Sequence, residues 1–174
     1  MKKIIQAVVA TAALIAACAH AEGLYVGGSF GPSHIKGDDV GGLAITDHSA
    51  TGIKLYGGYS FTPNIAVEGG YVDFGKFGNS AGHLKANGLF VDAVGTWPIV
   101  DKFSLLGRIG LVHAKLDGSD IGSDRGTSLK VGAGVQYDID QNFAIRGEAE
   151  HYRFDALGSK PSTNLYSIGV NYRF

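Results

Sequence analysis

Two histidines are the residues of this sequence best suited to hydrolytic chemistry. His113 and His151 each lie near the end of a segment in which apolar and polar residues alternate. A histidine within reach of a serine can activate the hydroxyl as a nucleophile, as in many acyl-transfer enzymes. The segment that begins at His151 reads HYRF, which offers no serine two positions on. We therefore expect no enzyme, and keep a lipid A-modifying hydrolase or acyltransferase as a remote alternative.

An aspartate-rich segment, LDGSDIGSDRG from Leu116 to Gly126, is the second candidate. Carboxylates are oxygen ligands that Ca²⁺ prefers, but their spacing here does not fit the EF-hand pattern. We interpret the segment as a solvated loop, with weak binding of Ca²⁺ or of cations that bridge lipopolysaccharide as the alternative. His34, His48 and His83 also fall in expected loops, without the spacing of a metal site. No metal and no cofactor are expected.

Eight alternating segments must position these residues. Each has apolar side chains at every second position, which is typical of a β-strand with one apolar face. The segments are approximately Leu24–Gly31, Ala50–Phe61, Ile65–Phe74, Leu84–Trp97, Phe103–His113, Ser128–Ile139, Phe143–Phe154 and Leu165–Phe174. An all-β fold is therefore predicted.

The connections between these segments are of two kinds. Three are tight, namely Thr62–Asn64, Pro98–Lys102 and Asp140–Asn142. Four are long and polar, namely Pro32–Ser49, Gly75–His83, Ala114–Thr127 and Asp155–Asn164. Short turns at one end, long loops at the other and an even number of strands are typical of an outer-membrane β-barrel. We predict an eight-stranded antiparallel up-and-down transmembrane β-barrel in the outer membrane of a Gram-negative cell, with both termini periplasmic.

A soluble small barrel, with its apolar face inward, is the structural alternative. The polar face of the segments is rich in glycine and poor in charge, whereas the apolar face continues for about ten residues per strand, as in membrane barrels. This composition favours a lipid-facing wall around a narrow lumen.

The N-terminus has the pattern of a secretory signal. Met1–Lys3 is positively charged, Ile4–Ala17 is almost entirely apolar, and Ala19–Ala21 has the small-x-small pattern of a cleavage site. We predict a signal peptide over residues 1–21 and a barrel domain over residues 22–174. Because Ile15–Cys18 resembles a lipoprotein box, acylation of Cys18 is the alternative.

Composition excludes other classes of partner. Without Lys2 and Lys3, 13 Lys and Arg face 16 Asp and Glu, which gives the mature chain a net charge of −3 and no basic patch for nucleic acid. Cys18 is the only cysteine and leaves with the signal, so no disulfide is expected. The 27 glycines and the abundant Tyr and Phe agree with β structure.

Strand parity directs seven charged side chains into the lumen. An eight-stranded barrel is only wide enough for side chains to fill, and isolated buried charges are very unfavourable, so these groups should pair. They could form a gate that passes ions when pairs exchange, or a polar plug that closes the tube, and we favour the plug. The predicted lumen network is Glu68, Asp92, Arg108, Lys130, Arg146, Glu148 and Glu150.

Aromatic residues cluster near the strand ends, as in interfacial girdles. Near the tight turns lie Phe61, Trp97, Phe103, Tyr137, Phe143, Tyr172 and Phe174, and near the long loops lie Tyr71, Phe74, Tyr152 and Phe154.

Four stretches resemble the transmembrane domain of the outer membrane protein A family. They are LYGGYSFTPNIAVEGGYVDFG, VGTWPIVDKFSLLGRIGLV, GAGVQYDIDQNFAIRGEAE and the final GVNYRF. In that family an inward Glu of the third strand and inward Arg residues of the fifth and seventh strands match Glu68, Arg108 and Arg146. An inward Lys of the fourth strand and its Glu partner in the sixth fall on Val94 and Gln136, so one alternative ion pair is missing, which weakens the case for a gate.

The resemblance implies a set of partners and a role. A terminal aromatic after alternating apolar positions, here Tyr172 and Phe174, resembles the signal read by the barrel-assembly machinery, and periplasmic chaperones are implied with it. The expected surroundings are the lipid bilayer and lipopolysaccharide. The expected role is membrane integrity, with surface loops that could bind an extracellular or host ligand; a narrow pore for small solutes is the alternative. Large members carry a peptidoglycan-binding domain, which we do not expect here.

Overall fold

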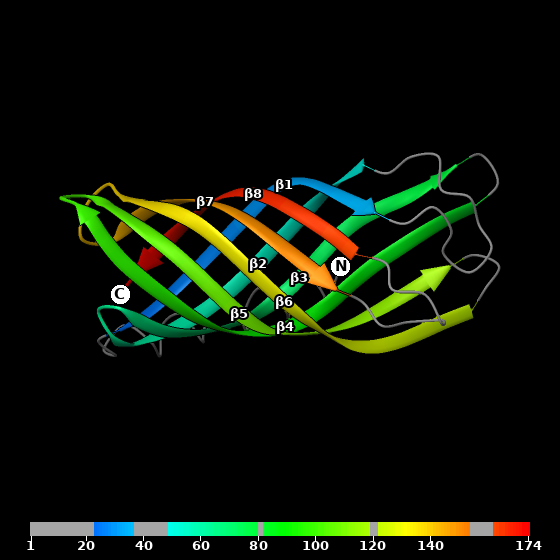
Figure 1. Cartoon of the computed structure of the whole chain (residues 1–174), viewed down its shortest axis with the longest axis horizontal. Helices are drawn as coiled ribbons and strands as arrows, with labels where there is room; N and C mark the ends of the chain where they lie inside the picture. The colour runs from blue at the N-terminus through cyan, green and yellow to red at the C-terminus, as the bar shows by residue number, and fades with distance from the viewer. Residues whose placement is uncertain (1–22, 37–48, 80–81, 119–121, 154–161) are drawn as a thin grey trace, which may run out of the picture.

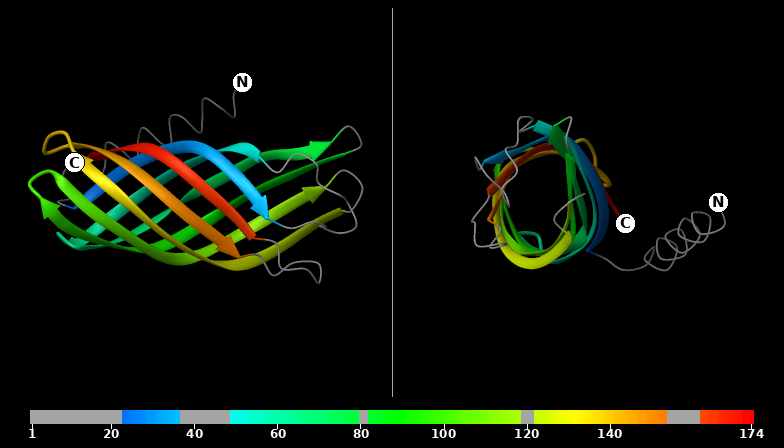
Figure 2. Two further views of the ribbon diagram at one scale, coloured as in Figure 1. Left: turned by 45° about the horizontal axis from the view of Figure 1, so that its top comes forward. Right: turned by 90° about the vertical axis from the view of Figure 1, so that its right-hand side faces the viewer.

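Eight antiparallel strands close into a barrel in the computed structural model, which describes residues 23–36, 49–79, 82–118, 122–153 and 162–174. The strands are β1 (Leu24–Lys36), β2 (Ser49–Thr62), β3 (Ile65–Asn79), β4 (Gly82–Val100), β5 (Phe103–Gly118), β6 (Gly122–Asp138), β7 (Phe143–Arg153) and β8 (Ser162–Arg173). Each strand pairs with its neighbours in the chain, and β8 pairs with β1. Figure 2 shows the closed ring end-on. The predicted eight-stranded barrel is confirmed.

The tight turns and the C-terminus lie at one end of the barrel, on the left in Figure 1. Side chains of the turns bond to the local backbone. Thr62 Oγ1 accepts from the backbone N–H of Ile65 at 3.0 Å, and Asp140 Oδ1 accepts from those of Asn142 and Phe143 at 2.8 and 2.7 Å. Side-chain acceptors of this kind stabilise a turn, because they bond to backbone N–H groups that have no partner in the β-ladder.

The turn between β4 and β5 is tighter than predicted. Pro98–Val100, which we expected in the turn, belongs to β4 and pairs with β5 across a register shift. Only Asp101 and Lys102 connect the strands, and Asp101 has a positive φ of 28°. An aspartate tolerates positive φ better than most residues, which suits it to this position.

At the opposite end the strands are longer than predicted. β3 and β4 continue through most of Gly75–His83, and β5 and β6 through most of Ala114–Thr127. β1 also continues to Lys36 and β8 begins at Ser162, so strand residues occupy part of all four segments that we expected to be loops. Alternation marks only the part of a strand that faces lipid, whereas backbone pairing continues where both faces are polar. The remaining connections, residues 37–48, 80–81, 119–121 and 154–161, lie outside the described residues, as do residues 1–22 with the predicted signal peptide.

Apolar side chains cover the outer wall and charged side chains occupy the interior. Leu55, Leu89 and Val91 expose 61%, 66% and 61% of their surface on the outside, whereas Lys54, Glu68 and Lys130 are fully buried. A soluble barrel would have the reverse arrangement, so that alternative is wrong. Among the described residues, no helix is long and apolar enough to span a membrane.

We predict a pH-dependent contribution from the turn carboxylate of Asp140. The backbone N–H groups of Phe143 and Asn142 bond to it and lower its pKa in the folded protein. A lowered folded pKa stabilises the barrel above the pKa of the unfolded chain, and this stabilisation is lost as pH falls through the folded pKa. Asp140→Asn keeps an acceptor but removes the charge. The wild type should be more stable than Asp140→Asn at neutral pH. The difference in stability should decrease as the pH falls below the ordinary pKa of aspartate, about 4, and disappear below the lowered pKa of the folded protein.

The measurement is urea unfolding in lipid vesicles, followed by the fluorescence of Trp97, the only tryptophan. A wild-type advantage over Asp140→Asn that is the same at acid and at neutral pH would contradict this account.

Candidate functional site

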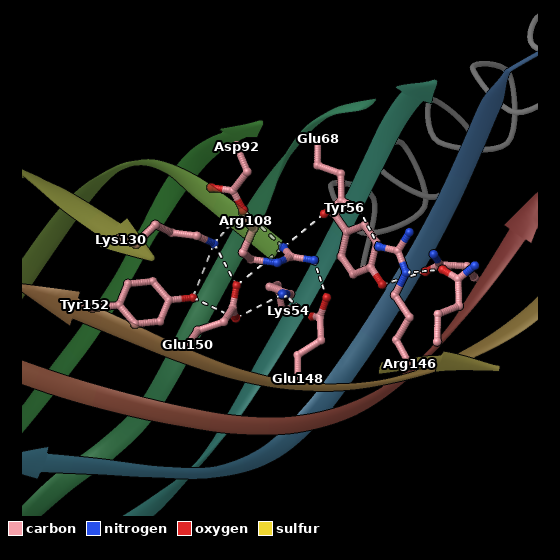
Figure 3. Close-up of polar contacts among 12 residues, drawn as sticks. Lys54, Tyr56, Glu68, Asp92, Arg108, Lys130, Arg146, Glu148, Glu150 and Tyr152 are labelled. Carbon is pink, nitrogen blue, oxygen red and sulfur yellow. Dashed lines mark hydrogen bonds and ion pairs between the residues drawn. The ribbon is translucent and has the colours of Figure 1, made fainter. Parts of the chain in front are cut away.

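Arg108 lies at the centre of a network of ion pairs inside the barrel (Figure 3). Its Nη1 lies 3.0 Å from Glu68 Oε2 and 3.1 Å from Asp92 Oδ2, and its Nη2 donates to Glu148. Glu150 Oε1 is 3.4 Å from the same Nη1. One guanidinium from β5 therefore joins acids from β3, β4 and β7 across the lumen, which its fork of donors makes possible.

Two lysines complete the network on its other side. Lys54 Nζ on β2 donates to Glu148 Oε2 at 2.8 Å and to Glu150 Oε2 at 2.9 Å. Lys130 Nζ on β6 lies 2.8 Å from Asp92 Oδ2 and 3.0 Å from Glu150 Oε1. Each of these acids is therefore shared between cations from different strands.

Arg146 connects the network to the short-turn end of the barrel. Its Nη1 donates to Glu68, and its Nε donates to Gln136 Oε1 at 2.8 Å. The guanidinium carbon lies 5.3 Å from the ring centre of Tyr25, whose hydroxyl donates to Glu68 Oε1 at 2.8 Å. The Tyr56 hydroxyl lies 2.5 Å from the side-chain amide of Asn171. Aromatic and amide groups thus surround the guanidinium.

An aromatic layer covers the network toward the long-loop end. Phe74 and Tyr152 are fully buried, with ring centres 4.7 Å apart in an edge-to-face arrangement. Lys130 Nζ lies 4.0 Å from the ring centre of Phe90, close enough for a cation–π interaction. We placed Phe74 and Tyr152 in the outer girdle, which is wrong: they share the even, inward parity of Glu68 and Glu150. Tyr71 is exposed on the wall, and Phe154 lies outside the described residues.

The structure brings together all seven charged residues that parity directed into the lumen, and adds one that we missed. Lys54 is the only charged residue of its strand, and its partners are 94 and 96 residues away in the chain. Its even position, shared with Tyr56 and opposed to Ile53 and Leu55, is the signal that could have identified it. With Lys54 the described lumen holds four acids and four bases, so the charges balance. Val94 and Gln136, where the family has an ion pair, are buried beside this network.

The terminal strand closes the barrel. Tyr25 to Phe30 of β1 pair with β8, and the backbone N–H of Phe174 donates to the carbonyl of Leu24 at 3.1 Å. The Tyr172 ring lies 5.1 Å from that of Phe174 and 5.0 Å from that of Phe143, in the girdle near the tight turns. Both C-terminal aromatics are therefore built into the seam between the first and last strands.

His113 and His151 each lie beside a polar side chain other than serine. His113 Nδ1 lies 3.0 Å from Thr127 Oγ1, and His151 Nδ1 lies 2.7 Å from Asn164 Oδ1. Gly27–Gly31 matches the G-x-S-x-G pattern, but it lies in the continuous strand β1 and not in the strand-to-helix turn that carries this motif in α/β-hydrolases. No group of three or more His, Cys, Asp or Glu in the described part of the chain could hold a metal ion.

Comparisons with known proteins give the same architecture. Residues 5–174 match the family model of the outer membrane protein beta-barrel domain. Outer membrane protein A of Salmonella typhi is 28% identical over 145 residues, which cover 74% of this chain and 41% of that protein. The protein of the same name from Shigella flexneri is 29% identical over 145 residues, covering 74% and 42%. The chain therefore spans less than half the length of these relatives.

Two solved structures have the same fold. Ail of Yersinia pestis, the attachment invasion locus protein, solved in complex with the heparin analogue sucrose octasulfate, is 26% identical, with a TM-score of 0.61 over 88% of this chain and 99% of Ail. Neisserial surface protein A is 15% identical, with a TM-score of 0.67 over 88% of this chain and 98% of that protein, and shows the fold alone.

We predict that Lys54→Met lowers the free energy of unfolding by about 3–5 kcal/mol, because it leaves the buried carboxylates of Glu148 and Glu150 with too little compensating charge. Glu150→Gln in the same chain should restore part of this loss. The measurement is a double-mutant cycle by urea unfolding in lipid vesicles. If Lys54→Met has the same effect with and without Glu150→Gln, the two groups are not coupled.

We also predict that deletion of Phe174 impairs assembly more than stability. The residue lies at the end of the closing strand, so an incomplete β8 should slow closure, whereas a barrel already folded keeps the rest of its seam. The measurements are the amount of heat-modifiable protein in cell envelopes and the urea unfolding of refolded protein. Phe143→Ala, in the same girdle but inside the chain, is the matched control and should lower stability with little effect on assembly. Equal assembly of the deletion variant and the wild type would refute the prediction.

Proposed function

The chain belongs to the outer membrane β-barrel domain family, and we propose that it is a closed, non-conducting structural barrel that presents its surface connections to the outside. The observation that carries this proposal is the network of ion pairs across the lumen. Lys54 on β2 bonds to Glu148 and Glu150 on β7, and Arg108 on β5 joins β3, β4 and β7. Side chains from both sides of the tube therefore meet in its middle.

A cavity at the short-turn end of the barrel supports the proposal that the lumen is closed on the periplasmic side of the network. It has a volume of about 410 Å³ and is lined by Ser104, Gln136, Asp138 and Arg146 among other residues. Arg146 is both a wall of this cavity and a partner of Glu68. Solutes entering from the periplasm would therefore reach the guanidinium and stop there.

A narrow pore remains the alternative, because each shared acid has more than one cation available. Glu150 contacts Lys54, Lys130 and Arg108, so a passing ion could replace one partner at a time. Such exchange would separate fully buried charges from their partners, at a cost of several kcal/mol per ion. This cost favours the plug.

Binding by the surface connections is the second candidate role, and the similarity to Ail is what favours it. Ail was solved with a sulfated sugar. Residues 37–48 of this chain contain Asp38, Asp39 and Asp47 and no Lys or Arg, so this connection would repel a sulfated ligand. We therefore propose an adhesive role in which the connection formed by residues 37–48 binds a ligand that is not polyanionic.

An enzymatic role has little support in the described residues. The ring nitrogens that we considered for catalysis bond to Thr127 and Asn164, and neither pair includes a serine. Assembly through the barrel-assembly machinery and periplasmic chaperones is part of the proposal, since Tyr172 and Phe174 end the closing strand.

We predict that the wild-type barrel gives no steady single-channel current in planar bilayers, and that Arg146→Ala does. The substitution removes the side chain between the cavity and the network and leaves Glu68 with fewer partners. Arg173→Ala, at the same end but bonded to Asp138 near the surface, is the matched control and should not conduct. A current through the wild type that Arg146→Ala changes would instead support the pore. Liposome swelling with small sugars gives an independent measurement.

A further inference from the structure

The outer wall has a hollow over β2 and β3 that neighbouring side chains do not fill. Gly57 and Gly69 pair directly across these strands, and both occupy outward positions. In the same row, Val26 lies beside Gly57 and Val91 beside Gly69. Bulky outward residues border the hollow, Leu55 and Tyr71 on one side and Tyr59 and Val67 on the other.

Neither glycine is required by the backbone. Both have ordinary negative φ angles, since the positive-φ glycines of the described residues are Gly23 and Gly75. A β-carbon added at Gly57 would come no closer than 3.8 Å to the Tyr25 carbonyl, and one at Gly69 no closer than 3.7 Å to the Phe90 carbonyl, which are ordinary contacts. Glycine inside a strand costs about 0.5–1 kcal/mol relative to alanine. These positions therefore bear a cost that neither backbone conformation nor crowding explains.

Other outward glycines of the wall lie next to side chains, closely at Gly28, Gly95 and Gly107 and at ordinary contact distance at Gly147. Added β-carbons at Gly95 and Gly107 would lie 2.7 and 3.3 Å from the Trp97 ring. One at Gly28 would lie 3.1 Å from a methyl carbon of Leu55, and one at Gly147 would lie 3.8 Å from a methyl carbon of Val135. Within the same distance, β-carbons added at Gly57 and Gly69 would contact only backbone atoms. Glycine in a strand often marks a close approach by a ligand or another chain.

The hollow is part of a larger groove on the membrane face. The groove has a volume of about 940 Å³ and runs over β1, β2, β3 and the end of β8. Leu24, Tyr172 and Phe174 line one end of it, so it opens at the tight-turn rim of the barrel. That rim is periplasmic, which places the groove in the leaflet next to the periplasm.

We propose that this groove binds one acyl chain of a phospholipid of the periplasmic leaflet. The lining is almost wholly aliphatic, aromatic and glycine, with no charged residue in it. The bare backbone at Gly57 and Gly69 lies between Val26 and Val91, which are three strand spacings apart, about 14 Å, so an unbranched hydrocarbon chain, which is narrower, can lie between them. A chain that lies against the backbone here gains dispersion contacts along its length, each small but large in sum.

A second copy of this chain fits the groove less well. A two-fold dimer whose axis passes over the hollow would bring a hollow to face a hollow, and no outward side chain would then fill the space over Gly57 and Gly69. A dimer with its axis set to one side is the competing arrangement, which protein–protein crosslinks through β2 and β3 would detect. A single acyl chain fills it without any such mismatch.

The test is photo-crosslinking in phosphatidylethanolamine and phosphatidylglycerol vesicles that contain a phospholipid with a diazirine in its acyl chain. Mass spectrometry then maps the labelled residues. We expect Leu55 and Val67 to be labelled about threefold more than Val131 and Val135 on β6, a preference of about 0.7 kcal/mol. Leu55 and Val135 are similarly exposed, at 61% and 51%, so exposure alone does not produce the difference.

Filling the groove should abolish the preference. Gly57→Leu with Gly69→Leu should reduce labelling at Leu55 and Val67 to the level of β6, whereas Gly147→Leu on β7, the matched control, should leave it unchanged. Heat-modifiable migration on unboiled gels reports folding, and the wild-type map decides the question even if the double variant fails to fold. Uniform wild-type labelling, a preference that survives filling, or protein–protein crosslinks through β2 and β3 would each overturn the proposal.

Discussion

The absence of water in the bilayer is the constraint on which the rest of this structure depends. An unpaired backbone N–H or carbonyl costs several kcal/mol in hydrocarbon, so the sheet must close, and the pairing of β8 with β1 closes it. Closure with eight strands leaves a lumen only wide enough for side chains. Every charge directed inward must therefore find an opposite charge within that space. The closed sheet and the balanced ion-pair network follow from the same requirement.

Among the described residues, the lumen has equal numbers of acids and bases, and this balance matters more than any single ion pair. The positions where the family has a Lys–Glu pair are Val94 and Gln136 here, and Lys54 supplies a base from a different strand. The opposite charges meet in space although they come from strands far apart in the chain. Because Arg108 shares its donors among several acids, a change in one partner is felt by the others, and the network acts as one unit. Such a unit fixes strand register more firmly than separate pairs would.

Sequence reasoning predicted the parts that alternation and turn length encode. The strand number, the inward face and seven of the lumen charges follow from period two, because one face meets lipid and the other does not. Lys54 was missed because its partners are remote and its own strand carries no other charge. Phe74 and Tyr152 were misplaced because proximity to a strand end was allowed to outweigh parity. The strands were drawn too short because alternation ends with the lipid contact, whereas hydrogen bonding between strands does not.

The inner and outer faces of the barrel wall constrain their residues to different degrees. Inside, neighbouring strands leave no room for change at some positions; an added β-carbon at the inward Gly70 would overlap the backbone of β2, so glycine is required there. Outside, lipid accommodates almost any apolar shape, and glycine at Gly57 or Gly69 is not required by the fold. A costly residue in a permissive environment indicates a use outside the fold itself. The interior of this barrel therefore carries the proposal that the lumen is closed, whereas its outer wall carries the proposal that an acyl chain lies against it.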